Sequence, residues 1–161
     1  MTKRLVPLLV LLCQSTSFAQ GSPITDAYRQ LRLLSSSTQT GISYRDFVLE
    51  VRKAIGLVDI ALEDSKPSKA TQKLEEIKTT YSDINELWGC RFSSKYISIA
   101  LSSCLGIGFQ QRNPIVVQSL RETLAANEFA EMEDFTGVFV GSMLGKASAQ
   151  VKQLGGMLKA R

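Results

Sequence analysis

Apolar side chains recur every three or four residues through the middle of the chain, which is the spacing of one face of an α-helix. Over residues 43–64 this apolar series is Phe47, Val51, Ala54, Val58 and Ala61. Over residues 69–89 it is Ala70, Leu74, Ile77, Tyr81, Ile84 and Trp88. Two such helices joined by a short polar segment fold back on each other, because each must bury its apolar face. We therefore predict an antiparallel helical hairpin.

Residues that favour helix ends mark the limits of this hairpin. Ser43 and Asp46 have the spacing of a capping box, in which each side chain bonds to the backbone N–H of the other residue. Ser68 is expected to begin the second helix, and Gly89 is expected to end it.

The pattern predicts further helices on both sides of the hairpin. They are expected over residues 22–34, 94–105, 113–127 and 131–158. The segment Gly106-Ile107-Gly108 is expected to end the second of these helices, and Gly155-Gly156 to fray the last. We expect an all-α fold in a single domain over residues 20–161, a small bundle of four to five helices built on the hairpin.

The first nineteen residues have the pattern of a cleaved bacterial signal peptide. Two basic residues precede an apolar run over residues 5–12, which is too short to span a membrane. Cleavage is expected between Ala19 and Gln20, which predicts export to the periplasm of a Gram-negative bacterium. A lipoprotein is not expected, because the bulky Leu12 stands before Cys13 where lipidation needs a small residue.

The segment Gly41-Ile42-Ser43-Tyr44-Arg45-Asp46-Phe47 is followed by a helix rich in Val and Ala and then by a helix that ends in Leu87-Trp88. This arrangement resembles a helical hairpin that recurs in uncharacterised exported bacterial proteins. The resemblance covers residues 41–88, about a third of the mature chain. It implies a helical hairpin and export, and it implies no activity, because none is known for that group.

Composition narrows the classes of function. Two of the 19 basic residues lie in the signal segment, so the mature chain has a net charge of +2. This charge is too small to indicate nucleic-acid binding. The sequence contains no histidine, which excludes histidine-based acid–base catalysis and most zinc, copper and iron sites. We expect neither an enzyme nor a cofactor.

Two cysteines, Cys90 and Cys104, remain after signal cleavage. An oxidising compartment favours a disulfide between them. If residues 92–103 form one straight helix, however, the two sulfur atoms lie too far apart for a bond. A disulfide therefore requires residues 91–94 to turn the chain back alongside the next helix, and the sequence leaves both outcomes open.

Small residues repeat every four positions in the last predicted helix, at Gly137, Gly141, Gly145 and Ala149. Such a row lets another backbone approach closely. The favoured partner is the protein's own hairpin, and the alternatives are another subunit or a membrane. Membrane insertion is the least favoured, because the uncharged run over residues 135–145 is too short to cross a bilayer.

Aromatic side chains gather near the open end of the predicted hairpin, at Tyr81, Trp88, Phe92 and Tyr96. Core packing is the default expectation for such rings. The sharper hypothesis is a ligand cleft that these rings line, with Arg91 placed to orient an anion.

Three functions follow from these features. The first is a non-enzymatic exported module that acts by protein–protein contact, with an unknown protein partner or with further copies of itself. The second is a small-ligand-binding protein with its cleft near Trp88. The third is a peripheral membrane protein, held by the basic residues of its last helix, and this function is not favoured.

Overall fold

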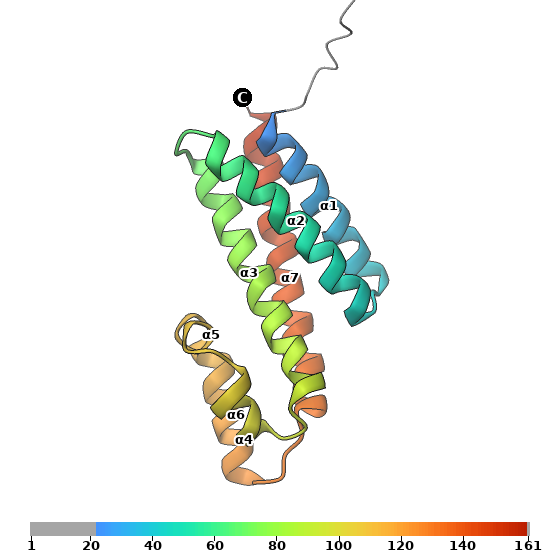
Figure 1. The fold of residues 1–161 in the computed structure, drawn as a ribbon, viewed down its shortest axis with the longest axis vertical. Helices are drawn as coiled ribbons and strands as arrows, with labels where there is room; N and C mark the ends of the chain where they lie inside the picture. Colours follow the sequence, from blue (N-terminus) through green and yellow to red (C-terminus); the bar gives the residue numbers. More distant parts are fainter. Residues whose placement is uncertain (1–21, 161) are drawn as a thin grey trace, which may run out of the picture.

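The computed structural model describes residues 22–160, and its fold is all-α, as predicted (Figure 1). Four long helices form the bundle: α1 (Pro23–Thr40), α2 (Tyr44–Asp64), α3 (Lys69–Ser93) and α7 (Met132–Lys159). α3 and α7 lie side by side along the molecule, and α1 and α2 pack against the half of this pair that lies nearest the C-terminus (Figure 1).

The short helices between α3 and α7 form a separate layer at the other end of the molecule (Figure 1). This layer, here called the cap, consists of α4 (Ile97–Ile99), the π-helical turn η1 (Ala100–Cys104), α5 (Ile107–Arg112) and α6 (Pro114–Ala126). The helix predicted over residues 94–105 thus begins three residues late. This segment ends at Cys104, just before Gly106 as expected, but Gly106 is also the N-cap of α5, a helix that the pattern did not predict.

The predicted hairpin of α2 and α3 is confirmed, and its apolar series forms the centre of the core. Ten of the eleven predicted positions are no more than 2% exposed: Phe47, Val51, Ala54, Val58, Ala61, Ala70, Leu74, Ile77, Tyr81 and Ile84. The eleventh, Trp88, is only partly buried. The alternating spacing of three and four residues is therefore sufficient to identify the inner faces of both helices.

The helix starts agree with the capping residues, although the capping box lies elsewhere. Ser43 accepts a hydrogen bond from the backbone N–H of Asp46 (3.2 Å), but its hydroxyl donates to the Asp46 carboxylate (2.7 Å). The reciprocal box is formed instead by Ser68 and Thr71, whose side chains accept from each other's backbone N–H groups at 3.2 and 2.8 Å. Two unsatisfied donors at the start of α3 are thereby paired.

Two glycines that were expected to weaken or end helices lie inside them. α3 continues past Gly89 to Ser93, and α7 continues past Gly155 to Lys159. At Gly89 the Tyr44 hydroxyl lies 2.6 Å from the position that a Cβ atom would take. The ring of Tyr28 fills the corresponding space at Gly155. Both glycines therefore serve as places of close side-chain approach, and the predicted helix end and fraying are wrong.

The first helix, predicted over residues 22–34, continues through the following Ser/Thr run as far as Thr40. The hydroxyls of Ser37, Thr38 and Thr40 donate to carbonyl oxygens three or four residues earlier. Ser35 is buried and donates to Ser148 of α7 (3.0 Å). These bonds satisfy the hydroxyl groups within the helix, so the run does not break it.

Candidate functional site

Three of the four rings predicted to line a ligand cleft pack against other aromatic rings instead. Tyr81 is 1% exposed and lies in the core beside Phe47, with ring centroids 6.4 Å apart. Burial raises the pKa of Tyr81 to about 12, and the nearby Ser35 hydroxyl offsets part of this rise. Trp88 and Phe92 both pack against the ring of Tyr44, at centroid distances of 5.6 and 4.7 Å.

The cations beside these rings are already paired. Arg91, expected to orient an anion, forms an ion pair with Glu133 instead. Lys95 lies 3.1 Å from the Glu131 carboxylate, and its ammonium also lies 5.2 Å from the ring centre of Tyr96. These pairs join the end of α3 to the start of α7. The predicted residues therefore stabilise this corner of the fold and do not surround a common cleft.

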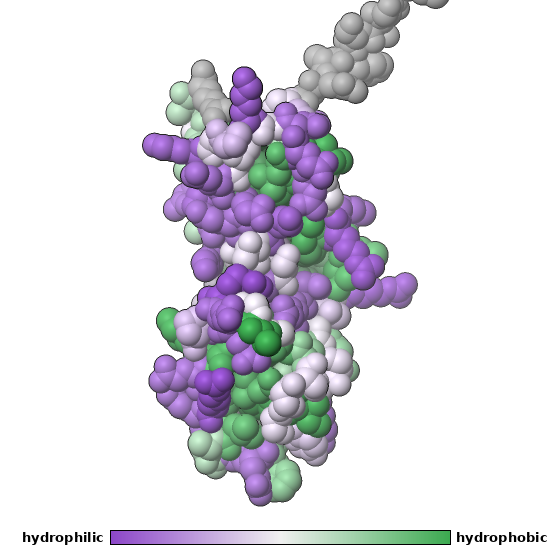
Figure 2. All heavy atoms as spheres, turned by 60° about the vertical axis from the view of Figure 1, so that its left-hand side comes forward, coloured by the Kyte–Doolittle hydropathy of each residue, from purple (hydrophilic) through white to green (hydrophobic). Residues whose placement is uncertain are grey.

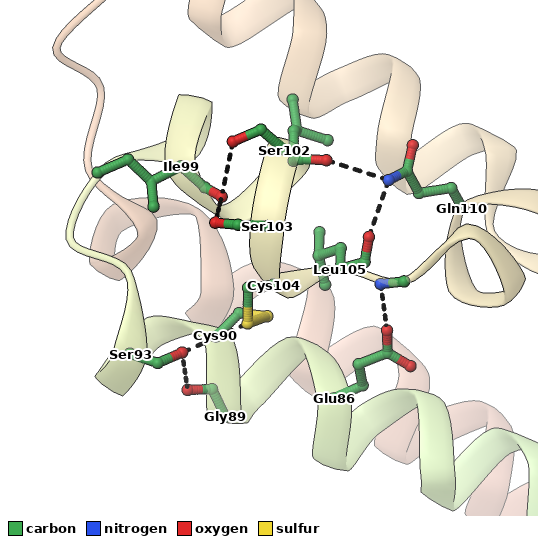
Figure 3. Close-up of a disulfide and its surroundings, with 12 residues drawn as sticks. Glu86, Gly89, Cys90, Ser93, Ile99, Ser102, Ser103, Cys104, Leu105 and Gln110 are labelled. Carbon is green, nitrogen blue, oxygen red and sulfur yellow. Dashed lines mark hydrogen bonds between the residues drawn. A yellow bond between two sulfur atoms is a disulfide. The ribbon is translucent and has the colours of Figure 1, made fainter.

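Cys90 and Cys104 form a disulfide, with their Cα atoms 5.8 Å apart (Figure 3). The chain adopts an extended conformation at Ser94 after α3 ends, so η1 runs back past the last turn of that helix. Beside the disulfide, the Gly106 N–H donates to the Glu86 carboxylate of α3 at 2.6 Å (Figure 3). The first part of the cap is thus fastened to the end of α3 by a covalent bond and a charge-assisted hydrogen bond.

The row of small residues on α7 faces outward. Gly137, Gly141, Gly145 and Ala149 are all exposed, and a Cβ atom at any of the three glycines would meet no neighbouring atom within 4 Å. Val138 lies among them and is 71% exposed. The favoured expectation, that this row packs against the protein's own hairpin, is therefore wrong.

A groove that the sequence analysis did not predict lies between α3, α7 and the cap. It consists of two adjoining hollows of about 590 and 280 Å³. Both hollows are lined by Thr80, Asp83, Arg112, Asn113 and Lys146, which form the waist of the groove. This cap groove is of the size that small-molecule sites in proteins usually have.

A buried carboxylate holds the waist of the cap groove together. Asp83 is 4% exposed and accepts hydrogen bonds from Nε and Nη2 of Arg112, at 3.2 and 2.5 Å to its Oδ1 atom. Asn113 is the N-cap residue of α6, but its side chain makes no capping bond and donates its amide to Asp83 (2.8 Å) and to the Phe109 carbonyl (3.1 Å). The hydrogen bond with Asp83 raises the pKa of Arg112, so the guanidinium stays charged.

The two ends of the cap groove differ in polarity. The larger hollow extends along α3 and α7 and is lined by polar side chains beyond the waist: Gln72, Glu75, Glu76, Thr79 and Gln150. The smaller hollow extends under the cap and is largely apolar beyond the waist, with Pro114, Ile115, Val116, Phe139, Ser142 and Met143. Glu76 forms an ion pair with Lys73 on the same helix.

One signal in the sequence points to the waist. Thr80, Asp83 and Leu87 have the spacing of a single helix face, and all three are buried on α3. A carboxylate at a buried helical position needs a charged or hydrogen-bonding partner. The sequence therefore allows Asp83 to be identified as a buried carboxylate that needs a partner. Nothing in the pattern indicates that this partner is Arg112.

No family model matches the chain, and neither the curated proteins nor the solved structures include a significant match. Within residues 22–160, no helix has both the length and the apolar character required to cross a membrane. The same residues contain no group of three or more acidic or cysteine side chains that could hold a metal ion.

Proposed function

We propose that this protein is an exported helical module that acts by binding protein through the outer face of α7. The observation that supports this most directly is the exposed row of Gly137, Gly141 and Gly145. Each glycine costs about 1 kcal/mol relative to alanine inside a helix. Nothing in the described chain approaches these three positions, so the monomer gains no packing from them. Close approach by another chain is the role that explains the row.

Apolar side chains exposed on the surface of the molecule favour a protein partner. The run over residues 135–145 contains no charged residue. Exposed apolar side chains also occur on and after the cap, where Ile107 and Ile115 are each 76% exposed and Phe129 is 67% exposed. Figure 2 shows the face that includes the cap, with hydrophobic residues gathered in its lower part and hydrophilic residues dominating above. Exposed apolar areas of this kind mark interaction surfaces.

The partner we propose is a second copy of the chain. Glu131 and Glu133 at the start of α7 pair with Lys95 and Arg91 but stay 43% and 67% exposed, whereas the later half of the helix carries the exposed Lys152. In an antiparallel pair of α7 helices, the acidic end of each copy would lie beside the basic half of the other. Such a two-fold contact uses the same surface on both copies, with Gly141 near its centre.

Export is the second part of the proposal. The predicted signal peptide, its cleavage point between Ala19 and Gln20, and Cys13 lie outside the described residues. The disulfide between Cys90 and Cys104 supports export, because such bonds persist in oxidising compartments and are rare in the cytosol.

The experiment compares Gly141→Leu with Gly56→Leu in the mature protein. Gly56 is a matched control, because it is also exposed within a helix and has no atom near its missing side chain. We expect wild type and Gly56→Leu to dimerise with increasing concentration in analytical ultracentrifugation, and Gly141→Leu to remain monomeric with unchanged helicity. A wild type that stays monomeric, or equal dimerisation of both variants, would contradict the proposal.

A further inference from the structure

We propose that the cap groove binds an apolar monocarboxylate, with the carboxylate at Lys146 and the apolar body in the smaller hollow. The site is separate from the outer face of α7 and does not depend on dimerisation. Its basis is the combination of a net positive waist with an adjoining apolar recess in one groove.

The charges at the waist favour an anion. Asp83 and Arg112 neutralise each other through their hydrogen bonds. Lys146 is exposed and forms no ion pair with any residue that the structure describes. The waist therefore carries one uncompensated positive charge, and a carboxylate placed there would gain a charge-assisted hydrogen bond.

The acidic side chains of the larger hollow do not cancel this charge at the waist. Glu76 forms an ion pair with Lys73, and the Glu75 carboxylate lies 4.0 Å from the ammonium of Lys78, which pairs more closely with Asp59 (2.7 Å). Both glutamates line only the larger hollow, whereas Lys146 lines both hollows. A negative group is thus favoured at the waist and beneath the cap, away from the glutamates.

The smaller hollow supplies the apolar contacts. Its volume is about 280 Å³, and its lining includes Ile115, Val116, Phe139 and Met143. Val116 and Met143 are each 8% exposed and belong to the core, whereas Ile115 is 76% exposed at the rim. Burial of an alkyl group against these side chains would remove apolar surface of both ligand and protein from water.

Hydrogen bonds hold part of the waist in place without a ligand. Three side chains from two parts of the chain, Asp83, Arg112 and Asn113, are joined by hydrogen bonds. A preformed site loses less conformational entropy on binding than a flexible one. The ligand chemistry could come from a free acyl carboxylate or from the C-terminal residue of a polypeptide, and the two sources can be separated by choice of probe.

The experiment measures binding to the mature protein by isothermal titration calorimetry. The probes are octanoate and N-acetyl-leucine, each compared with its uncharged counterpart, octanol or N-acetyl-leucinamide. The variants are Lys146→Gln and, as a matched control on the same helix, the exposed Lys152→Gln, which lies outside both hollows. A third variant, Ile115→Ser, alters the smaller hollow at an exposed position and leaves the core intact.

We expect at least one carboxylate to bind about tenfold more tightly than its uncharged counterpart, since a charge-assisted hydrogen bond contributes about 1.5 kcal/mol or more. Lys146→Gln should remove this difference, Ile115→Ser should weaken both members of the pair, and Lys152→Gln should change neither. Tighter binding of octanoate identifies an acyl chain, and tighter binding of N-acetyl-leucine identifies a polypeptide C-terminus. The proposal is overturned if neither carboxylate binds, if charge makes no difference, or if both lysine variants behave alike.

Discussion

Two adjacent glycines near the end of α7 have opposite surroundings. Gly155 is buried against the ring of Tyr28, whereas Gly156 is exposed and has no neighbouring atom within 4 Å of its missing Cβ. We expect Gly156→Ala to raise the free energy of unfolding by about 1 kcal/mol, because alanine favours the helix. Gly155→Ala should lower it, because Tyr28 must move. Urea denaturation measures both values, and a change of the same sign in the two variants would contradict this explanation.

These residue-scale roles were not predictable from the chain alone. Gly89 and Gly155 look like helix ends or weak points in sequence, and each is in fact the contact site of a tyrosine from a distant part of the chain. The local pattern shows that a position lacks a side chain, but it does not show what occupies the space. Asn113 likewise has the local position of a helix cap, but its amide bonds to Asp83 on another helix.

At the scale of the element, the long helices could be predicted from the sequence and the short ones could not. α2 and α3 contain 21 and 25 residues, long enough for the apolar spacing to repeat several times. α5 has six residues and α4 has three, so no period can be established in either. Short helices also have little stability of their own and form because tertiary contacts hold them. The long hairpin could therefore be predicted in detail, whereas the cap could not.

The disulfide is the contact that holds the shortest elements, α4 and η1, against α3. We expect Cys104→Ser to lower the free energy of unfolding by about 3 kcal/mol, the value that chain entropy gives for a closed loop of about fifteen residues. The loss should be localised, because Cys90 lies in the last turn of α3, where the cap joins the bundle. Hydrogen exchange should speed up over residues 97–104 and remain slow over residues 47–61. Equal acceleration in both segments would show that the disulfide stabilises the whole fold and not the cap.

At the scale of the molecule, the sequence predicts the parts better than their arrangement. The all-α class and the hairpin follow from spacing, but the cap is positioned by pairs that are distant in sequence. These are the ion pair of Asp83 with Arg112 and the hydrogen bond of Glu86 with Gly106. Any of these charged residues has several possible partners in the sequence, so the cap groove becomes visible only in three dimensions.

Variants of Asp83 and Arg112 test how the cap is held against the bundle. Arg112→Met leaves a buried carboxylate with only Asn113 as a partner. An uncompensated buried polar group costs about 2 kcal/mol, so this variant should lose about that much stability. Arg121→Met removes an exposed arginine of α6 and is the matched control, expected to change stability by less than about 0.5 kcal/mol.

Adding Asp83→Asn to Arg112→Met should recover part of the loss, because the double variant no longer buries an unpaired charge. Urea denaturation of the two single variants, the double variant and wild type measures this coupling. If Arg112→Met and Arg121→Met lose equal stability, the ion pair does not hold the cap. If instead the double variant is less stable than Arg112→Met, Asp83 stabilises the fold through Asn113, and the arginine is secondary.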